Sequence, residues 1–187
     1  MVQAPTKPIT LDEFLSLPET KPASEYIDGQ IFQKPMPKGK HSRLQGKFVN
    51  VINAVVEPER LACAFPELRC TFDSGSIVPD IAVFTWDQIP TDENGEIADI
   101  FSFAPDWTIE ILSPDQRQTR VTKNILRCLR NGTQMGWLID PDVRAILIYQ
   151  PGQEVEILDE PETVLPMPSF MHDLTYRVID LFGLLVL

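Results

Sequence analysis

Two acidic residues lie inside short apolar segments of this 187-residue chain, in "IVPDIAVF" (residues 77–84) and "DWTIEILSP" (residues 106–114). They are Asp80 and Glu110, and each segment is expected to be a strand. Burying two like charges is costly or forces protonation, whereas a bound divalent cation removes that cost. Carboxylate ligands alone suit Mg²⁺ or Mn²⁺. The pattern indicates a metal site, and it leaves open that Asp80 caps a turn after Pro79 while Glu110 pairs with an arginine.

The alternation of side chains along a strand predicts how the two acids are placed. Asp80 should share a face with Ala82 and Phe84, and Glu110 should share one with Thr108. If the two strands are neighbours, both carboxylates can lie side by side beneath the flanking helices. Replacing either acid is then expected to leave folding intact or improved, because an unpaired buried charge is removed.

Other chemistries find little support in the sequence. The three cysteines, Cys63, Cys70 and Cys128, have no CxxC spacing and are interpreted as reduced thiols. With only His41 and His172 in the chain, neither a zinc site nor a nucleophile–histidine pair can be defended. No glycine-rich phosphate loop is present.

The N-terminal half contains three clear local signals. Thr10 followed by Glu13 is a capping-box pattern, and it predicts a short helix that stops at Pro18. Asp28-Gly29 lies between alternating residues, as is typical of a hairpin turn. Apolar residues at helical spacing predict an amphipathic helix over residues 42–56.

Further elements follow in a regular order. Strands are expected near residues 67–73, 77–84 and 107–112, with a long polar loop around Asn94-Gly95 before the third of them. A second helix is expected over about residues 115–131, with Gly132 at its C-terminus. The segments "GWLID" and "AILIY" predict two more strands.

This order predicts an α/β (α+β) fold with a mixed central β-sheet flanked by helices on both faces. Residues 1–187 are expected to form a single domain, because no repeat, linker or low-complexity tract interrupts them. The core should span about residues 20–150, and residues 151–187 should form a covering hairpin and tail.

The charge of the chain is unevenly distributed. The net charge of −11 at first argues against a nucleic-acid partner. However, residues 29–56 and 116–139 contain none of the 27 acidic residues and ten of the 16 basic residues. Their bases are Lys34, Lys38, Lys40, Arg43 and Lys47, then Arg117, Arg120, Lys123, Arg127 and Arg130. A basic rim beside the carboxylates is what a phosphate backbone requires, whatever the net charge.

Membrane and secretion signals are missing from the sequence. The longest apolar run, "LFGLLVL", is far shorter than the ~20 residues that cross a bilayer. The segment "MVQAPTKPIT" lacks the charged start and apolar stretch of a secretion signal. We expect a cytoplasmic protein without a membrane partner.

Five segments carry a resemblance to a known family. "YIDGQI", "KGKHSRLQGK", "VPDIAVF", "APDWTIEILSPD" and "GWLIDPD" occur in the order found in the putative restriction endonuclease family of the PD-(D/E)XK nuclease fold. The resemblance covers roughly residues 9 to 186 and implies a restriction endonuclease-like core. It implies that Asp80 and Glu110 are the acids of the motif and that Glu25 occupies a further acidic position. His41 and Gln45 fall at or near its polar positions before the first long helix.

The sequence departs from the family pattern at the lysine. The motif's lysine position, two residues after Glu110, is Leu112. The family's substitute lysine on the following helix aligns with Asn124, one residue after Lys123. One residue on a helix is ~100° of rotation, part of which a flexible lysine can cover, so Lys123 is the candidate cation. An acid common in the family four residues before Asn124 is replaced by Arg120.

The resemblance implies a metal-dependent endonuclease that hydrolyses phosphodiester bonds, most directly in DNA. Asp80 and Glu110 would hold Mg²⁺ (or Mn²⁺), with Glu25 and Lys123 as further catalytic residues. The expected nucleic-acid contacts are Lys40, His41, Arg43, Gln45, Arg117, Arg120, Arg127 and Arg130. A homodimer is expected by analogy. Two other functions stay open: a catalytically degenerate nuclease fold that binds nucleic acid or a partner, and a hydrolase of small phosphate esters.

Overall fold

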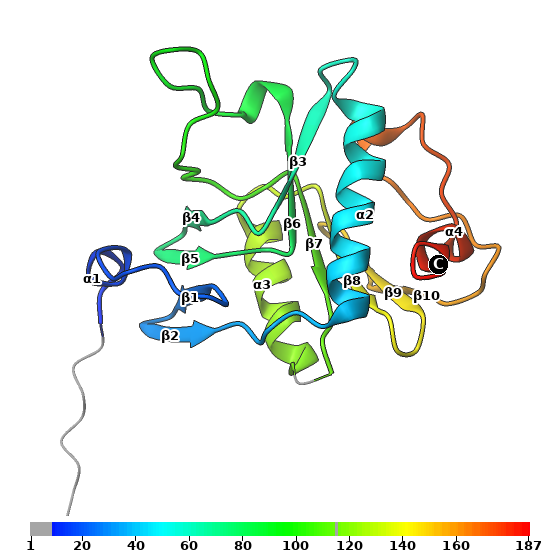
Figure 1. Cartoon of the computed structure of the whole chain (residues 1–187), viewed down its shortest axis with the longest axis horizontal. Coiled ribbons are helices and arrows are strands. Elements are labelled where there is room, and N and C mark those ends of the chain that lie inside the picture. The colour runs from blue at the N-terminus through cyan, green and yellow to red at the C-terminus, as the bar shows by residue number, and fades with distance from the viewer. Residues whose placement is uncertain (1–8, 115) are drawn as a thin grey trace, which may run out of the picture.

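The computed structural model describes residues 9–114 and 116–187, and a six-stranded sheet lies at its centre (Figure 1). The strand order is β10-β9-β8-β7-β6-β3. β7 and β8 run parallel, and the other neighbours run antiparallel. The strands are β3 (Ala62–Pro66), β6 (Ile81–Thr85), β7 (Trp107–Ile111), β8 (Met135–Asp140), β9 (Ala145–Tyr149) and β10 (Glu156–Leu158).

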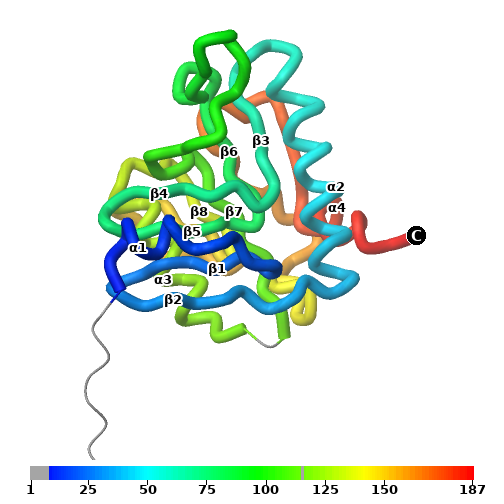
Figure 2. The backbone as a smooth tube through the Cα atoms, turned by 60° about the vertical axis from the view of Figure 1, so that its left-hand side comes forward, coloured from blue at the N-terminus to red at the C-terminus, as the bar shows by residue number. Residues whose placement is uncertain are grey.

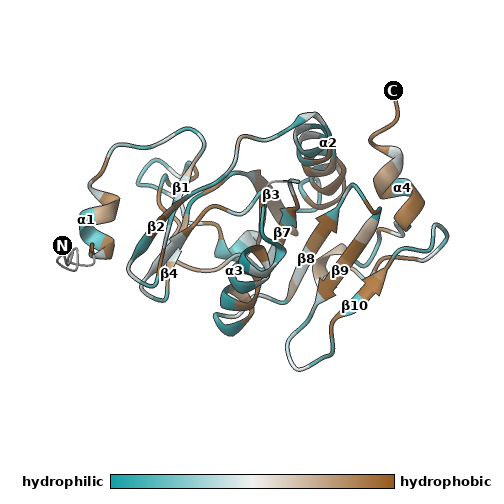
Figure 3. Ribbon diagram, turned by 90° about the horizontal axis from the view of Figure 1, so that it is seen from below, coloured by the Kyte–Doolittle hydropathy of each residue, from teal (hydrophilic) through white to brown (hydrophobic). Residues whose placement is uncertain are grey.

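Two long helices, α2 (Gly39–Val56) and α3 (Gln118–Arg130), cover opposite faces of this sheet (Figure 3). The large core lies on the α2 side, where Phe48 packs with Trp107 and Trp137. The α3 side carries smaller apolar clusters, which α3 joins through its buried residues Val121, Ile125 and Cys128. The predicted mixed sheet with helices on both faces is confirmed.

Figure 3 shows how the apolar residues are distributed. The central strands are hydrophobic, and the outward part of α3 is hydrophilic. Gly136 on β8 lets α3 approach closely, because a Cβ at this position would overlap the side chain of Ile125. The close approach fixes the height of α3 above β7, the strand that carries Glu110.

A second, four-stranded sheet was not predicted (Figure 2). Its order is β2-β1-β5-β4, and its strands are β1 (Ser24–Ile27), β2 (Gln30–Gln33), β4 (Cys70–Phe72) and β5 (Gly75–Ile77). The predicted hairpin turn at Asp28-Gly29 is confirmed, with φ of 50° and 80° at the two residues. The second sheet arises because the chain returns, some 40 residues after this hairpin, to pair Tyr26 with Ser76.

The predicted strand over residues 77–84 is wrong as a single element. β5 ends at Ile77 in the second sheet, and β6 begins at Ile81 in the central sheet. Pro79 has no N–H to donate to a ladder, so the chain changes sheets here. The strand predicted at residues 67–73 also differs, since β3 ends at Pro66 and β4 begins at Cys70. Asp80 therefore lies at the entrance of a strand.

The helices match the sequence signals closely. α1 (Leu11–Leu15) has the predicted capping box between Thr10 and Glu13. α2 begins at Gly39, three residues before its predicted start. α3 ends before Gly132, whose φ of +99° suits the residue after a helix. The predicted helix start at Asp115 lies outside the described residues.

The remaining segments connect and follow the strands of the central sheet. A 3₁₀ turn, η1 (Trp86–Gln88), opens the polar loop around Asn94-Gly95. After β10 the chain forms η2 (Ser169–Met171) and α4 (Val178–Gly183), both of which contact α2 (Figure 1). Within the described ranges, no helix combines the length and the apolar character that crossing a membrane demands.

Candidate active site

A largely buried lysine links the two acids at the point where the chain changes sheets. Lys34 follows β2 directly, and its Nζ lies 2.6 Å from Asp80 Oδ1 and 3.4 Å from Glu110 Oε2. The same Nζ donates to the carbonyl oxygen of Val78 at 2.8 Å. Only 11% of the lysine side chain is exposed. The structure thus brings Asp80 and Glu110 together around one positive charge.

Asp80 is the more firmly held of the two acids. Its Oδ2 accepts a hydrogen bond from the backbone N–H of Ile111 at 2.7 Å and lies 3.0 Å from His41 Nε2. Burial alone would raise its pKa, but Lys34 and His41 outweigh burial and hold the pKa below its usual range. Gln45 Nε2 donates to the carbonyl oxygen of Asp80. Asp80 is therefore a paired charge, which removes the reason to expect that its replacement leaves folding intact.

Glu110 is buried but poorly satisfied. Its Oε2 has the long contact with Lys34, and its buried Oε1 has no hydrogen-bond partner among the described residues. Burial, followed by the charges of Asp80 and Glu25, raises the pKa of Glu110 well above its usual value, although Lys34 opposes this. A buried carboxylate oxygen without a partner is a ready acceptor for a ligand.

Glu25 on β1 holds the segment through which the chain passes from β5 to β6. Its Oε1 accepts from the backbone N–H of Val78 at 3.0 Å, and its Oε2 accepts from Asn124 Nδ2 at 3.1 Å. Together, Glu25 and Lys34 satisfy the N–H and the C=O of Val78, which belongs to neither sheet. Both oxygens of Glu25 are thus engaged. Across the described ranges, no three side chains of His, Cys, Asp or Glu form a ready-made metal cage.

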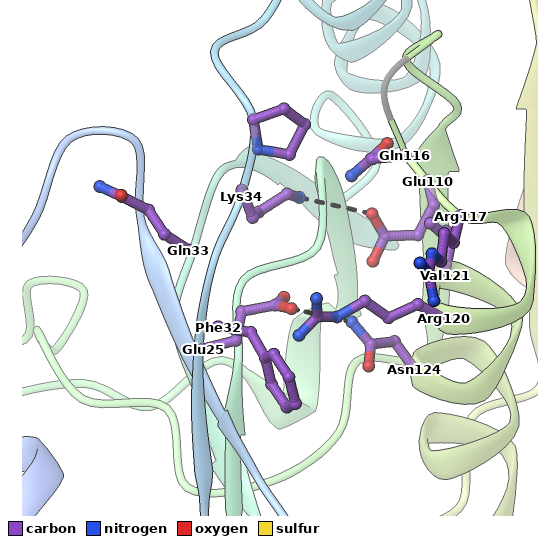
Figure 4. Close-up of a pocket in the computed structure, with 11 residues that line it drawn as sticks. Glu25, Phe32, Gln33, Lys34, Glu110, Gln116, Arg117, Arg120, Val121 and Asn124 are labelled. Carbon is purple, nitrogen blue, oxygen red and sulfur yellow. Dashed lines mark hydrogen bonds and ion pairs between the residues drawn. The ribbon is translucent and has the colours of Figure 1, made fainter.

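A cavity of about 300 Å³ opens beside these carboxylates, between the β1–β2 hairpin and α3 (Figure 4). In Figure 4, Glu25 and Lys34 point into it from the hairpin side, and Glu110 and Arg120 point into it from the other side. The Arg120 guanidinium lies over the ring of Phe32, 3.4 Å from its centroid. The remaining lining residues are Gln33, Pro35, Gln116, Arg117, Val121 and Asn124.

Two arginines, Arg117 and Arg120, bring positive charge to this cavity. Arg120 has a buried Nη2 atom with no hydrogen-bond partner among the described residues. Arg117 is exposed at the same rim. An anionic ligand in the cavity would meet both guanidinium groups, as a phosphate would require.

The structure does not bring Lys123 to the carboxylates. Lys123 is exposed and lines a neighbouring cavity with Asp28 and Gln30. Asn124, one residue later, is buried and reaches Glu25. The rotation of ~100° between successive helical residues separates the two positions. The cation that contacts both acids is Lys34.

Several predicted nucleic-acid contacts are engaged within the protein. Arg127 pairs with Asp28 and Asp73 at 2.6 and 3.3 Å and so fastens α3 to two turns of the second sheet. Arg43 donates to the carbonyl oxygens of Leu184 and Val186. His41 and Gln45 hold Asp80, and Lys40 forms an exposed pair with Asp142 at 2.7 Å. Arg130 is exposed near the C-terminal end of α3.

Lys34 is the site residue that the sequence did not single out. It lies in the acid-free segment 29–56, and this charge pattern was the one signal that included it. Five bases share that segment, and nothing local distinguishes Lys34 from the others. Its role becomes visible only when residue 34 meets residue 80, 46 positions later.

The mixed sheet carries one acid at the entrance of a central strand and a second acid within the neighbouring strand, as the resemblance to a restriction endonuclease-like core implies. Residues 11–180 match the family described as "Putative restriction endonuclease", and the chain belongs to this family. It is similar to a crystal structure described as a putative nuclease belonging to DUF820 from Anabaena variabilis ATCC 29413. The two share 65% identity over 96% of this chain and 100% of that one, with a TM-score of 0.94. No curated protein matches the chain.

Proposed function

We propose that this protein is a metal-dependent endonuclease that hydrolyses phosphodiester bonds in DNA. Membership of the nuclease family supports the reaction class. The observation that carries the proposal is the buried, unpartnered Oε1 of Glu110 beside the carboxylate of Asp80. Both acids surround one cation at the edge of a cavity that Arg117 and Arg120 also line.

The residues present fit a hard divalent ion. The available donors are carboxylate oxygens, which Mg²⁺ and Mn²⁺ prefer. Asp80 and Glu110 would hold the ion, and the contact of both acids with the ammonium of Lys34 supports a place for positive charge between them. Such an ion lowers the pKa of a bound water and stabilises the charge that grows on phosphoryl oxygens.

The protein's own groups prepare this site. The backbone N–H of Ile111 and the His41 ring fix the orientation of Asp80. Asn124 and the N–H of Val78 fix the orientation of the Glu25 side chain, which lines the same cavity as Glu110. These hydrogen bonds preorganise the acids, so little reorganisation is needed when the substrate arrives.

Arg120 of α3 and Arg117, the residue that precedes this helix, position the nucleic acid. Arg117 and Arg120 contribute guanidinium groups that match phosphate oxygens. Arg120 is held against Phe32, which limits its freedom before any ligand binds. Such contacts fix the backbone of the substrate and carry no sequence information. The cation beside the acids is Lys34, in place of the Lys123 expected from the sequence.

The test is cleavage of supercoiled plasmid and of labelled single- and double-stranded oligonucleotides, with Mg²⁺, Mn²⁺ or EDTA. We expect cleavage with either metal, none in EDTA, and a loss of ~10²-fold or more in Asp80→Asn and Glu110→Gln. Glu93→Gln, on the exposed polar loop, is the matched control and should cleave normally.

Each of the other functions has its own signature in this assay. Binding of DNA without metal-dependent cleavage would indicate a degenerate nuclease fold. Hydrolysis of p-nitrophenyl phosphate without cleavage of DNA would indicate a small-ester hydrolase. Cleavage that survives in Asp80→Asn would come from a contaminant and would refute the proposed site.

A further inference from the structure

Lys34 occupies the one oxygen of Asp80 that a metal ion could still use. Asp80 Oδ2 is already shared by the Ile111 N–H at 2.7 Å and by His41 Nε2 at 3.0 Å. The other oxygen, Oδ1, faces Lys34 Nζ at 2.6 Å. An ion that bridges Asp80 and Glu110 therefore needs an oxygen that the ammonium holds.

The ammonium of Lys34 has an acceptor for each of its three N–H groups. A lysine ammonium has three donors, and this one faces three acceptors: the Val78 carbonyl, Asp80 and Glu110. It is nearly buried and lies between two buried acids. In the metal-free protein, Lys34 thus supplies the positive charge that keeps these carboxylates together.

The other carboxylates that could bind the ion, Glu25 and Glu110, do not remove the competition with Lys34. Glu25 already accepts one hydrogen bond on each oxygen, from the Val78 N–H and from Asn124. Glu110 Oε1 is free, but it belongs to the same carboxylate whose Oε2 contacts Lys34. An ion held by Glu110 would stand close to the ammonium, and the two positive charges would repel each other in a buried environment.

We propose that Lys34 and the divalent ion exclude each other at the carboxylate pair, so that metal binding releases the lysine. The inference rests on the proposed function, because it assumes that the pair holds a metal. The released side chain enters the cavity that it already lines with Arg117 and Arg120. Metal loading would then place a third basic side chain beside the phosphate, and Lys34 acts as a positioning residue coupled to the metal.

The first experiment measures Mn²⁺ affinity by isothermal titration calorimetry on the metal-free full chain. We expect the Kd of Lys34→Met to be at least about tenfold lower than that of the wild type, because the ion no longer displaces an ammonium. Lys47→Met removes the same charge from an exposed position of α2 and should leave the Kd unchanged.

The outcomes separate this inference from the proposed function. Equal Mn²⁺ affinity in the wild type and Lys34→Met would overturn the exclusion and leave the metal site standing. Absence of binding in both would overturn the metal site and, with it, the inference. Tighter binding in Lys47→Met as well would show a general charge effect and would also overturn it.

The second experiment needs no variant and so does not depend on the folding of Lys34→Met. The wild-type chain is acetylated with limiting acetic anhydride, with and without saturating Mn²⁺, and modification is quantified for each lysine by mass spectrometry. We expect modification of Lys34 to rise several-fold with Mn²⁺ and that of Lys47 to stay constant. If Lys34 remains equally protected while Mn²⁺ is bound, the lysine has not moved and the inference is wrong.

Discussion

The two acids should differ in what they contribute to stability. In Asp80→Asn, the amide nitrogen must face either Lys34 or the donors at Oδ2, because an amide has only one acceptor oxygen. The buried ammonium also loses its nearest counter-charge, which lies 2.6 Å away. Removing one partner of a buried ion pair costs ~3–5 kcal/mol. Because Lys34 keeps Glu110 and the Val78 carbonyl, we expect a loss of about 3 kcal/mol for Asp80→Asn.

Glu110→Gln should behave differently. One Glu110 oxygen has no partner, and the other is 3.4 Å from Lys34, which is longer than a strong hydrogen bond. The substitution removes a buried carboxyl group whose pKa burial raises, and it keeps the shape of the side chain. Lys34 retains Asp80. We therefore expect a free energy of unfolding within about 1 kcal/mol of the wild type, or above it.

Urea unfolding in EDTA, followed by tryptophan fluorescence, measures both changes. Trp107 and Trp137 are fully buried and report on the core. The comparison is valid where the m-values of the three proteins agree, since a changed m-value signals a changed denatured or native state. Equal stability of Asp80→Asn and the wild type, or an equal loss in both variants, would refute the conclusion that Lys34 pairs mainly with Asp80.

Three further predictions concern α3. Gly136→Ala should lower the free energy of unfolding by ~1–3 kcal/mol, because its Cβ would overlap Ile125, and thermal denaturation would detect this. Arg117→Ala should weaken binding of duplex DNA and lower the log–log salt slope by roughly 0.9, whereas Arg127→Ala should change the slope little, since its guanidinium is paired. Asn124→Lys should raise the cleavage rate, because this buried position lines the cavity of the acids; an unchanged rate at saturating DNA would contradict this.

The local pattern of the sequence was sufficient for most helices and for β7, β8 and β9 of the central sheet. The capping box at Thr10, the turn at Asp28-Gly29 and the helix end before Gly132 depend on neighbouring residues, and all three occur in the structure. Alternation and helical spacing depend on the same short range. Asp80 and Glu110 were also visible in the sequence, because a carboxylate in an apolar segment is a conflict that can be read locally.

The second sheet and the environment of each acid could not be read in this way. The segment after β4 pairs with the hairpin of β1 and β2, and no periodicity encodes which distant strands meet. Pro79 was in the sequence, but its effect, a change from one sheet to the other, depends on there being two sheets. The sequence therefore predicted two equivalent acids in one strand pair, and the structure made them unequal.

The sequence alone shows which residues are charged, whereas the tertiary structure decides which of these charges pair. The acid-free segments correctly contained the cations of the site, but five bases in each segment look alike along the chain. Lys34 was distinguished only by its contact with Asp80, and Arg127 was withdrawn from the candidate binding surface only by Asp28 and Asp73. Electrostatic energy depends on distance and burial, and both are fixed when remote segments pack together.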